Sequence, residues 1–197
     1  MKTLILTIVA LLNTNVFAET YKIDTAASSV EWRAGKKIGS YHNGKIQIKS
    51  GEVQTNSKNE LTAAQIVVDM KTISNDDLKD SPDNQKKLVG HLSNDDFFKV
   101  EKYPESTFKM TGMKLKPGSK DEYLVKGDLT IIGTTKPVEF PIQMTSDKTT
   151  LTGTGILKIE RLNWGLKYGS GSIFKTLTAD KIINDSFELT LKVVAKK

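Results

Sequence analysis

The chain of 197 residues contains no cysteine, two histidines and only two arginines among its 29 basic residues. Without cysteine it forms no disulfide and no thiolate zinc site. His42 and His91 have no diagnostic ligand spacing around them, so we expect no metal. The basic residues are nearly all lysine and are spread along the chain, whereas nucleic-acid-binding proteins gather them on one face with arginine. We therefore expect no nucleic-acid partner.

Long apolar runs are also absent, apart from one short run at the N-terminus. Leu4–Leu12 contains a single threonine and no charge, Lys2 precedes it, and Val16 and Ala18 stand before Glu19. This order is typical of a cleaved secretory signal, and the run is shorter than the roughly 20 residues that span a bilayer. We expect residues 1–18 to be removed and residues 19–197 to form one domain in the periplasm or outside the cell.

The rest of the sequence alternates between apolar and polar residues in many places, most clearly at 123–131, 138–144 and 187–193. Alternation gives a strand one buried face and one solvent-exposed face, and it favours antiparallel pairing. Turn-forming residues separate the runs. We predict eight strands, at 28–34, 43–55, 60–71, 106–116, 122–132, 136–146, 149–161 and 182–195.

Eight antiparallel strands in one small domain lose their exposed edges only if the sheet closes, so we expect an all-β, up-and-down, lipocalin-like barrel. Residues 74–98 lack alternation and form an insertion between the third and fourth strands. A short helix is predicted there over Gln85–Leu92, capped by Asp83 or Asn84. A barrel of eight strands can be filled by its own side chains or hold one small ligand, and the pattern leaves both open.

No motif in the chain points to catalysis. The paired aspartates at 76–77 and 95–96 are sequence neighbours, and neighbours on a helix or strand do not face each other. Ser106 and Ser172 each match S-x-x-K, but the partner motifs of that nucleophile are missing. We expect no catalytic residue and no cofactor, with a lipid-acting hydrolase as a weaker alternative.

Four stretches of sequence share a pattern with one known family. The most specific is KGDLTIIGTTKPV at 126–138, because a hairpin with Gly-Asp-Leu-Thr and Thr-Lys-Pro at this spacing is hard to meet by chance. The others lie at 21–32, 91–108 and 182–189. Together they resemble the YceI family of lipocalin-like, polyisoprenoid-binding secreted proteins. The resemblance implies an extended eight-stranded barrel with a helical insert, and a long apolar pore that holds an isoprenoid chain, a quinone-like molecule or another amphipathic lipid.

Apolar and aromatic side chains from many separate segments could line such a pore. Face parity selects those on strands, although one bulge would invert the choice, and the helical insertion is expected to cover one end. The predicted lining residues are Trp32, Met70, Leu88, His91, Leu92, Phe97, Phe98, Phe108, Met110, Leu129, Ile131, Phe140, Trp164 and Phe174.

We therefore expect a non-catalytic protein that binds and carries or sequesters a long-chain amphipathic lipid in the barrel. Each buried CH₂ group contributes about 0.8 kcal/mol, so a long chain binds tightly without a polar contact. The formal net charge of +6 is compatible with transient contact with an anionic membrane surface. The sequence is also compatible with a homodimer. The alternative is a stress-related protein with a solid barrel that acts through protein contacts.

Overall fold

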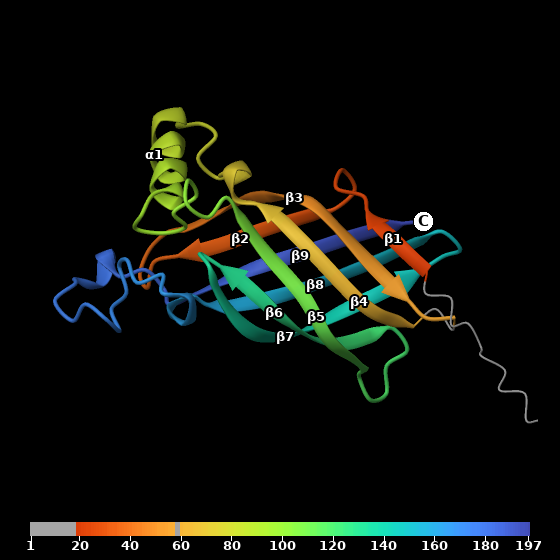
Figure 1. Cartoon of the computed structure of the whole chain (residues 1–197). Coiled ribbons are helices and arrows are strands. Elements are labelled where there is room, and N and C mark those ends of the chain that lie inside the picture. The colour runs from red at the N-terminus through yellow and green to blue at the C-terminus, as the bar shows by residue number, and fades with distance from the viewer. Residues whose placement is uncertain (1–18, 58–59) are drawn as a thin grey trace, which may run out of the picture.

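The computed structural model describes residues 19–57 and 60–197, so the predicted signal segment 1–18 lies outside the described residues. Within these ranges the chain forms nine β-strands, one α-helix and three short 3₁₀ helices (Figure 1). The strands are β1 (Glu19–Ile23), β2 (Ser29–Gly35), β3 (Tyr41–Thr55), β4 (Leu61–Asp69), β5 (Glu105–Leu115), β6 (Glu122–Ile131), β7 (Thr134–Ser146), β8 (Thr150–Glu160) and β9 (Ser186–Lys196). The helices are η1 (Met70–Thr72), α1 (Pro82–Ser93), η2 (Arg161–Trp164) and η3 (Ala179–Lys181). No helix in the described ranges has the length and apolar character to cross a bilayer.

Strands β2 to β9 close into an antiparallel barrel in chain order, because β9 pairs back with β2. The predicted closed barrel of eight strands is confirmed. β1 was not predicted. Like β2, it lies between β3 and β9, because it pairs with the second half of β3 and with the end of β9. Asp24 separates the two strands, because its carboxylate accepts hydrogen bonds from the N–H groups of Ala26 and Ala27 and so forms a tight turn.

The last strand begins later than predicted. β9 starts at Ser186 and not at residue 182. In residues 182–185, backbone carbonyl groups form hydrogen bonds outside the barrel sheet. The carbonyl oxygen of Ile182 accepts from Lys37 N, and that of Asn184 accepts from Arg161 Nε. These bonds hold the stretch before β9 against the end of the barrel instead of in the sheet.

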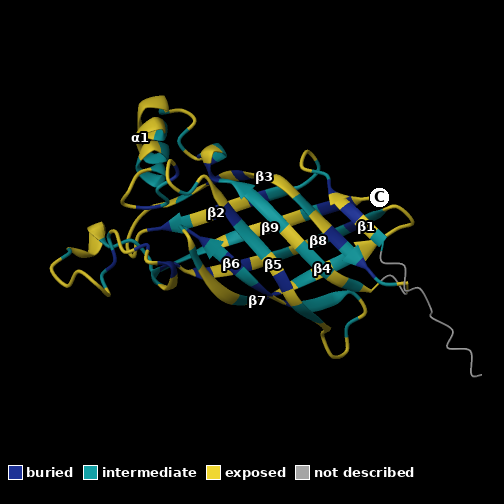
Figure 2. Ribbon diagram, viewed as in Figure 1, coloured by how far each residue is buried: buried dark blue, intermediate teal, exposed yellow. Residues whose placement is uncertain are grey.

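Helix α1 stands outside one end of the barrel (Figure 1), between β4 and β5, which are the third and fourth positions of the ring. The predicted caps are wrong: the helix begins at Pro82 and Ser81 is its N-cap residue. Proline is favoured in the first turn of a helix, because the N–H groups of that turn have no acceptor within the helix. The prediction of Asp83 or Asn84 as the cap did not take Pro82 into account. Along the strands, buried and exposed residues alternate (Figure 2), so the apolar faces point into the barrel.

The segment that leads into α1 is fastened to β2 and β3. Trp32 Nε1 donates to the carbonyl oxygen of Ser74 at 3.0 Å, and the buried Asn75 donates to the carbonyl oxygen of Asn43. Gly44 allows this approach, since a Cβ at that position would lie 1.9 Å from Ser74 O. The start of the insertion is therefore fixed to the rim of the barrel.

Candidate functional site

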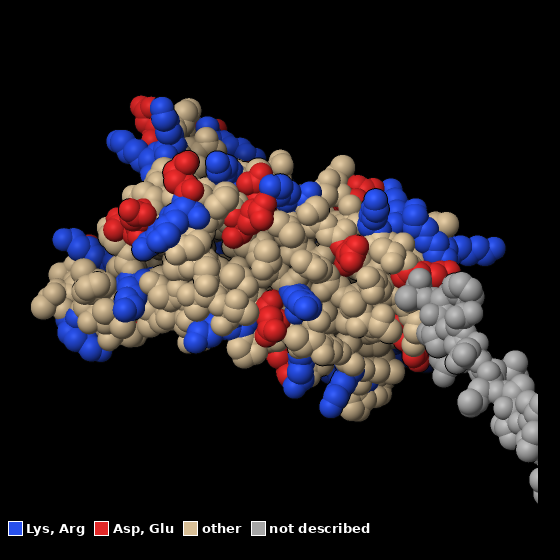
Figure 3. All heavy atoms as spheres, in the orientation of Figure 1, with Lys and Arg blue, Asp and Glu red and all other residues tan. Residues whose placement is uncertain are grey.

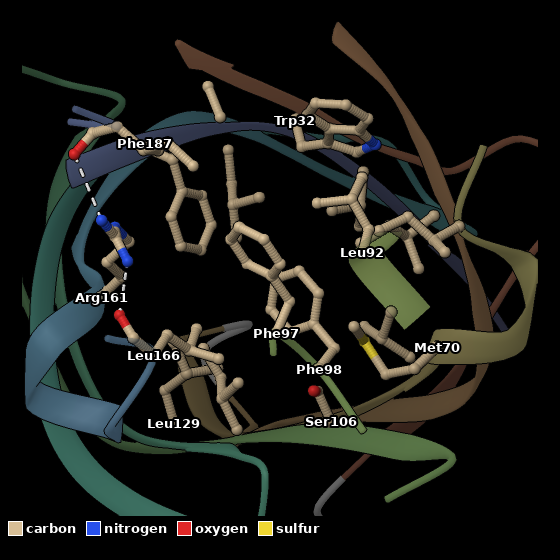
Figure 4. Close-up of a pocket in the computed structure, with 18 of the residues that line it drawn as sticks. Trp32, Met70, Leu92, Phe97, Phe98, Ser106, Leu129, Arg161, Leu166 and Phe187 are labelled. Carbon is tan, nitrogen blue, oxygen red and sulfur yellow. Dashed lines mark hydrogen bonds between the residues drawn. The ribbon is translucent and has the colours of Figure 1, made fainter. Parts of the chain in front are cut away.

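Two adjoining cavities occupy the interior of the barrel. The first cavity has a volume of about 110 Å³ and lies at the α1 end (Figure 4), where its walls include Trp32, Met70, Phe98, Arg161 and Leu166. The second cavity has a volume of about 150 Å³ and extends to the other end, with walls that include Val53, Phe108, Met110, Phe140 and Leu151. The two cavities share four lining residues, which are Val30, Val68, Leu129 and Leu189.

The size and lining of these cavities determine what can enter them. A protein cavity of roughly 150 Å³ lined by leucine, isoleucine and phenylalanine stays dry and accepts an apolar guest such as benzene. Both cavities are lined mostly by side chains of this kind, and four residues contribute to both linings. The side chains of the barrel therefore leave space for apolar groups of a guest in two neighbouring places.

Ten of the fourteen predicted lining residues line these cavities. They come from β2, η1, α1, the turn after α1, and strands β5 to β7, so the face parity assumed for the strands is correct at these positions. Those in the first cavity are Trp32, Met70, Leu92, Phe97, Phe98 and Ile131; those in the second are Phe108, Met110 and Phe140; and Leu129 lines both.

Leu88 and Trp164 lie outside the lining of both cavities. Leu88 is half-buried on α1 and packs on the cluster that contains Trp32 and Met70. Trp164 is buried in the wall, where its Nε1 donates to the carbonyl oxygen of Leu129 at 3.0 Å. These two side chains support the cavity walls and do not face the vacant space.

His91 and Phe174 are also outside the lining. The His91 ring meets Phe97 and Tyr168 edge-on, with centroids 5.1 and 4.6 Å away, and its Nε2 lies 3.2 Å from Asp96 Oδ2. His91 thus joins the α1 region to the segment before β9 on the outside of the first cavity. Phe174 is exposed on that segment. His91 was predicted from its place in the helical insertion and Phe174 from its aromatic side chain, and neither criterion fixes the direction of a loop or helix side chain.

A buried arginine forms one wall of the first cavity, and the sequence analysis missed it. Arg161 is 3% exposed. It donates to the carbonyl oxygens of Leu166 at 2.6 Å, Asn184 at 2.8 Å and Ile183 at 3.2 Å, and to Asp185 Oδ1 at 3.3 Å. These bonds commit four of the five guanidinium N–H groups to the chain. Arg161 therefore fastens the segment before β9 across the end of the barrel.

The charge of Arg161 is balanced within the protein. Burial lowers the pKa of its guanidinium, and the neighbouring Asp185 carboxylate opposes that shift. Burial raises the pKa of Asp185, but the hydroxyls of Ser170 and Ser172 and the charges of Arg161 and Lys175 outweigh it, so this pKa lies below its usual value. The two groups therefore form an ion pair at neutral pH, which leaves little net charge for an anionic guest.

One hydroxyl without a protein partner points into the first cavity. Ser106 on β5 is 8% exposed, and its Oγ is directed toward the vacant space (Figure 4). Its hydroxyl, unlike its backbone, forms no hydrogen bond with any residue in the ranges 19–57 and 60–197. A net hydrogen bond contributes about 0.5–1.5 kcal/mol, so a polar atom of a guest that pairs with this hydroxyl would be stabilised here. The inward direction of Ser106 follows from its parity with Phe108 and Met110.

Fold and cavities together define a closed antiparallel β-barrel with a hollow apolar interior. Across the described ranges, no three imidazole or carboxylate side chains are arranged to hold a metal ion. The chain belongs to the YceI-like domain family, whose match covers residues 21–195.

Individual relatives cover less of the chain. A UPF0312 protein of Pseudomonas putida is 34% identical over 140 residues, which are 70% of this chain and 65% of that protein. A UPF0312 protein of Photorhabdus laumondii is 54% identical over 48 residues, which are 24% of this chain and 23% of that protein. The chain thus spans less than two thirds of the length of each of these curated relatives.

Two solved structures share the fold. Burkholderia cenocepacia BcnA superposes with a TM-score of 0.68 at 24% identity, covering 88% of this chain and 99% of BcnA. A polyisoprenoid binding domain from Saccharophagus degradans, implicated in plant cell wall breakdown, gives a TM-score of 0.59 at 15% identity, with 89% and 97% of the two chains covered. At these identities the likeness shows a common fold.

Proposed function

We propose that the protein binds one long-chain amphipathic lipid, such as a polyisoprenoid or an isoprenoid quinone, inside the barrel and carries or sequesters it without catalysis. The observation that carries this proposal is the pair of apolar cavities that share four lining residues within one closed barrel. A flexible hydrocarbon tail fits such a space, and each buried CH₂ adds about 0.8 kcal/mol to binding. The Saccharophagus domain of the same fold is described as polyisoprenoid-binding, which supports this ligand class by analogy.

The few polar groups of the first cavity support binding rather than catalysis. Arg161 is engaged with backbone carbonyl groups and Asp185. Ser106 has no hydrogen bond to an imidazole, amine or carboxylate among the described residues, whereas a serine nucleophile needs such a base. Together with the predicted signal at residues 1–18, these features support a lipid carrier in the periplasm or outside the cell.

Native mass spectrometry of the purified protein, before and after extraction with organic solvent, tests the proposal. We expect one added mass in the range of an amphipathic lipid, its loss on extraction, and its return when a polyprenol or an isoprenoid quinone is added. A protein that carries no lipid after purification and binds neither probe would contradict the proposal.

Replacing Ser106 by alanine is expected to weaken the binding of a lipid with an oxygen-bearing head group by about fivefold, because one net hydrogen bond is lost. The affinity for squalene, a hydrocarbon without oxygen, should not fall. Competition against a fluorescent lipid, measured for both ligands, gives the two affinities. Thr107→Ala is the matched control, since Thr107 is the next residue of β5 and lines neither cavity. Equal weakening of both ligands would show that Ser106 makes no hydrogen bond to the guest.

A further inference from the structure

Large apolar side chains gather on the surface at one end of the barrel. Five of them are between 42% and 61% exposed there: Ile38, Tyr41, Tyr168, Ile173 and Phe174. Among the described residues, the other large apolar side chains with comparable exposure are Leu115 and Ile156, which lie on β5 and β8. We call residues 36–41 and 165–185 the tip. Scattered apolar residues are normal on a protein surface, but a group of this size at one site marks an interaction surface.

The two segments of the tip form one continuous surface. Lys37 N donates to the carbonyl oxygen of Ile182 at 2.8 Å, and Asn184 Nδ2 donates to that of Lys36 at 3.2 Å. Ser170 forms a parallel β-bridge with Ile183, so the loop before β9 also pairs with the stretch that contacts Lys36 and Lys37. The two segments of the tip are therefore held together at one end of the barrel (Figure 1).

The charge of the tip is positive. It contains two aspartates, of which Asp185 is paired with Arg161, so Asp180 is its one acidic residue outside that pair. Five exposed lysines surround the apolar groups: Lys36, Lys37, Lys167, Lys175 and Lys181. In the face drawn in Figure 3, this end (left) shows uncharged atoms with basic side chains around them, and an acidic group lies above it toward α1. An anionic surface is the complement of this arrangement.

We propose that the tip docks on the surface of an anionic lipid bilayer, with Ile38, Ile173 and Phe174 in the interface and the lysines against the head groups. Apolar and aromatic groups beside lysines are typical of membrane-surface segments, whereas lysine is depleted from protein–protein interfaces. The same segment supplies Leu166, Ile183 and Asn184 to the first cavity, so docking brings that cavity next to the bilayer. The proposal rests on the surface alone and holds whatever the cavities bind.

Sedimentation with vesicles tests the docking. The probe is the chain without residues 1–18, which contains every strand of the barrel, mixed with vesicles of phosphatidylcholine alone or of phosphatidylcholine and phosphatidylglycerol in equal parts. We expect binding to the mixed vesicles, little to the neutral ones, and a decrease with added salt. Lys175→Gln should weaken binding about fivefold, since it removes one basic residue and each basic residue near an anionic surface contributes about 1 kcal/mol. Ile173→Asp together with Phe174→Asp should weaken it by at least about tenfold, because two apolar groups leave the interface.

Leu115→Asp together with Ile156→Asp is the matched control, because it removes two equally exposed apolar groups from outside the tip. This control should bind vesicles like the parent, and circular dichroism should show that all variants are folded. Equal binding to both vesicle types, binding to neither, or equal loss in the control and tip variants would overturn the proposal. A concentration-dependent dimer that disappears only in the tip variants would also overturn it, by assigning the tip to a second copy of the chain.

Discussion

Replacing Arg161 by methionine is expected to lower the free energy of unfolding by about 3–5 kcal/mol, since it removes a buried guanidinium and leaves its hydrogen-bond acceptors without a donor. Methionine has a similar volume but donates no hydrogen bond. The carbonyl groups of Leu166, Ile183 and Asn184 would lose their donor, and Asp185 would lose its counter-charge. Urea unfolding followed by circular dichroism measures the change.

Arg33→Met is the control, because Arg33 is the other arginine of the chain and lies exposed over the ring of Tyr41 at 4.2 Å. An exposed cation–π contact contributes about 0.5–1 kcal/mol, so Arg33→Met should lower the free energy of unfolding much less than Arg161→Met does. Similar losses in both variants would show that the buried network of Arg161 does not hold the end of the barrel.

Replacing Val68 by phenylalanine is expected to reduce the affinity for a long-chain lipid by about 100-fold or more. Val68 on β4 is one of the four residues that line both cavities, so a larger ring narrows the passage between them. A tail confined to one cavity leaves about four CH₂ groups unburied, at about 0.8 kcal/mol each. Titration of delipidated protein with a polyprenol measures the loss, and a short prenol that fits one cavity should keep its affinity.

Val67→Phe controls for the larger side chain itself. Val67 is the adjacent residue of β4, lines neither cavity and points to the opposite face of the strand. This variant should bind long and short lipids like the parent protein. If Val68→Phe also binds long lipids like the parent, the two cavities do not form one continuous site.

The strands and their inward faces could be predicted because alternation is a local property. Met110, Leu129, Ile131 and Phe140 face the interior as the parity of their strands requires. The bulge of β5 falls between Met110 and Gly112, just beyond the residues whose parity was used. The bulge therefore did not invert the inward-facing positions that were predicted to line the interior.

The polar groups of the site escaped prediction because a pattern-based analysis assigns polar residues to the surface. Arg161 has the same parity as the buried Leu157 and Ile159, and Ser106 has that of Phe108, so parity could have placed both inside. The vacancy of the interior could not be predicted, because it depends on how side chains from many strands pack together. Nor could the positions of His91 and Phe174, which lie where no alternation guides the side chain.

The most direct test of the account is a high-resolution crystal structure of the protein purified with its natural contents. We expect continuous tubular density that runs from beside Ser106 and Arg161, past Val68 and Leu129, to the far end near Leu151. Cavities closed by rearranged side chains, or occupied by separate water molecules alone, would contradict the claim that the barrel is a container for a lipid.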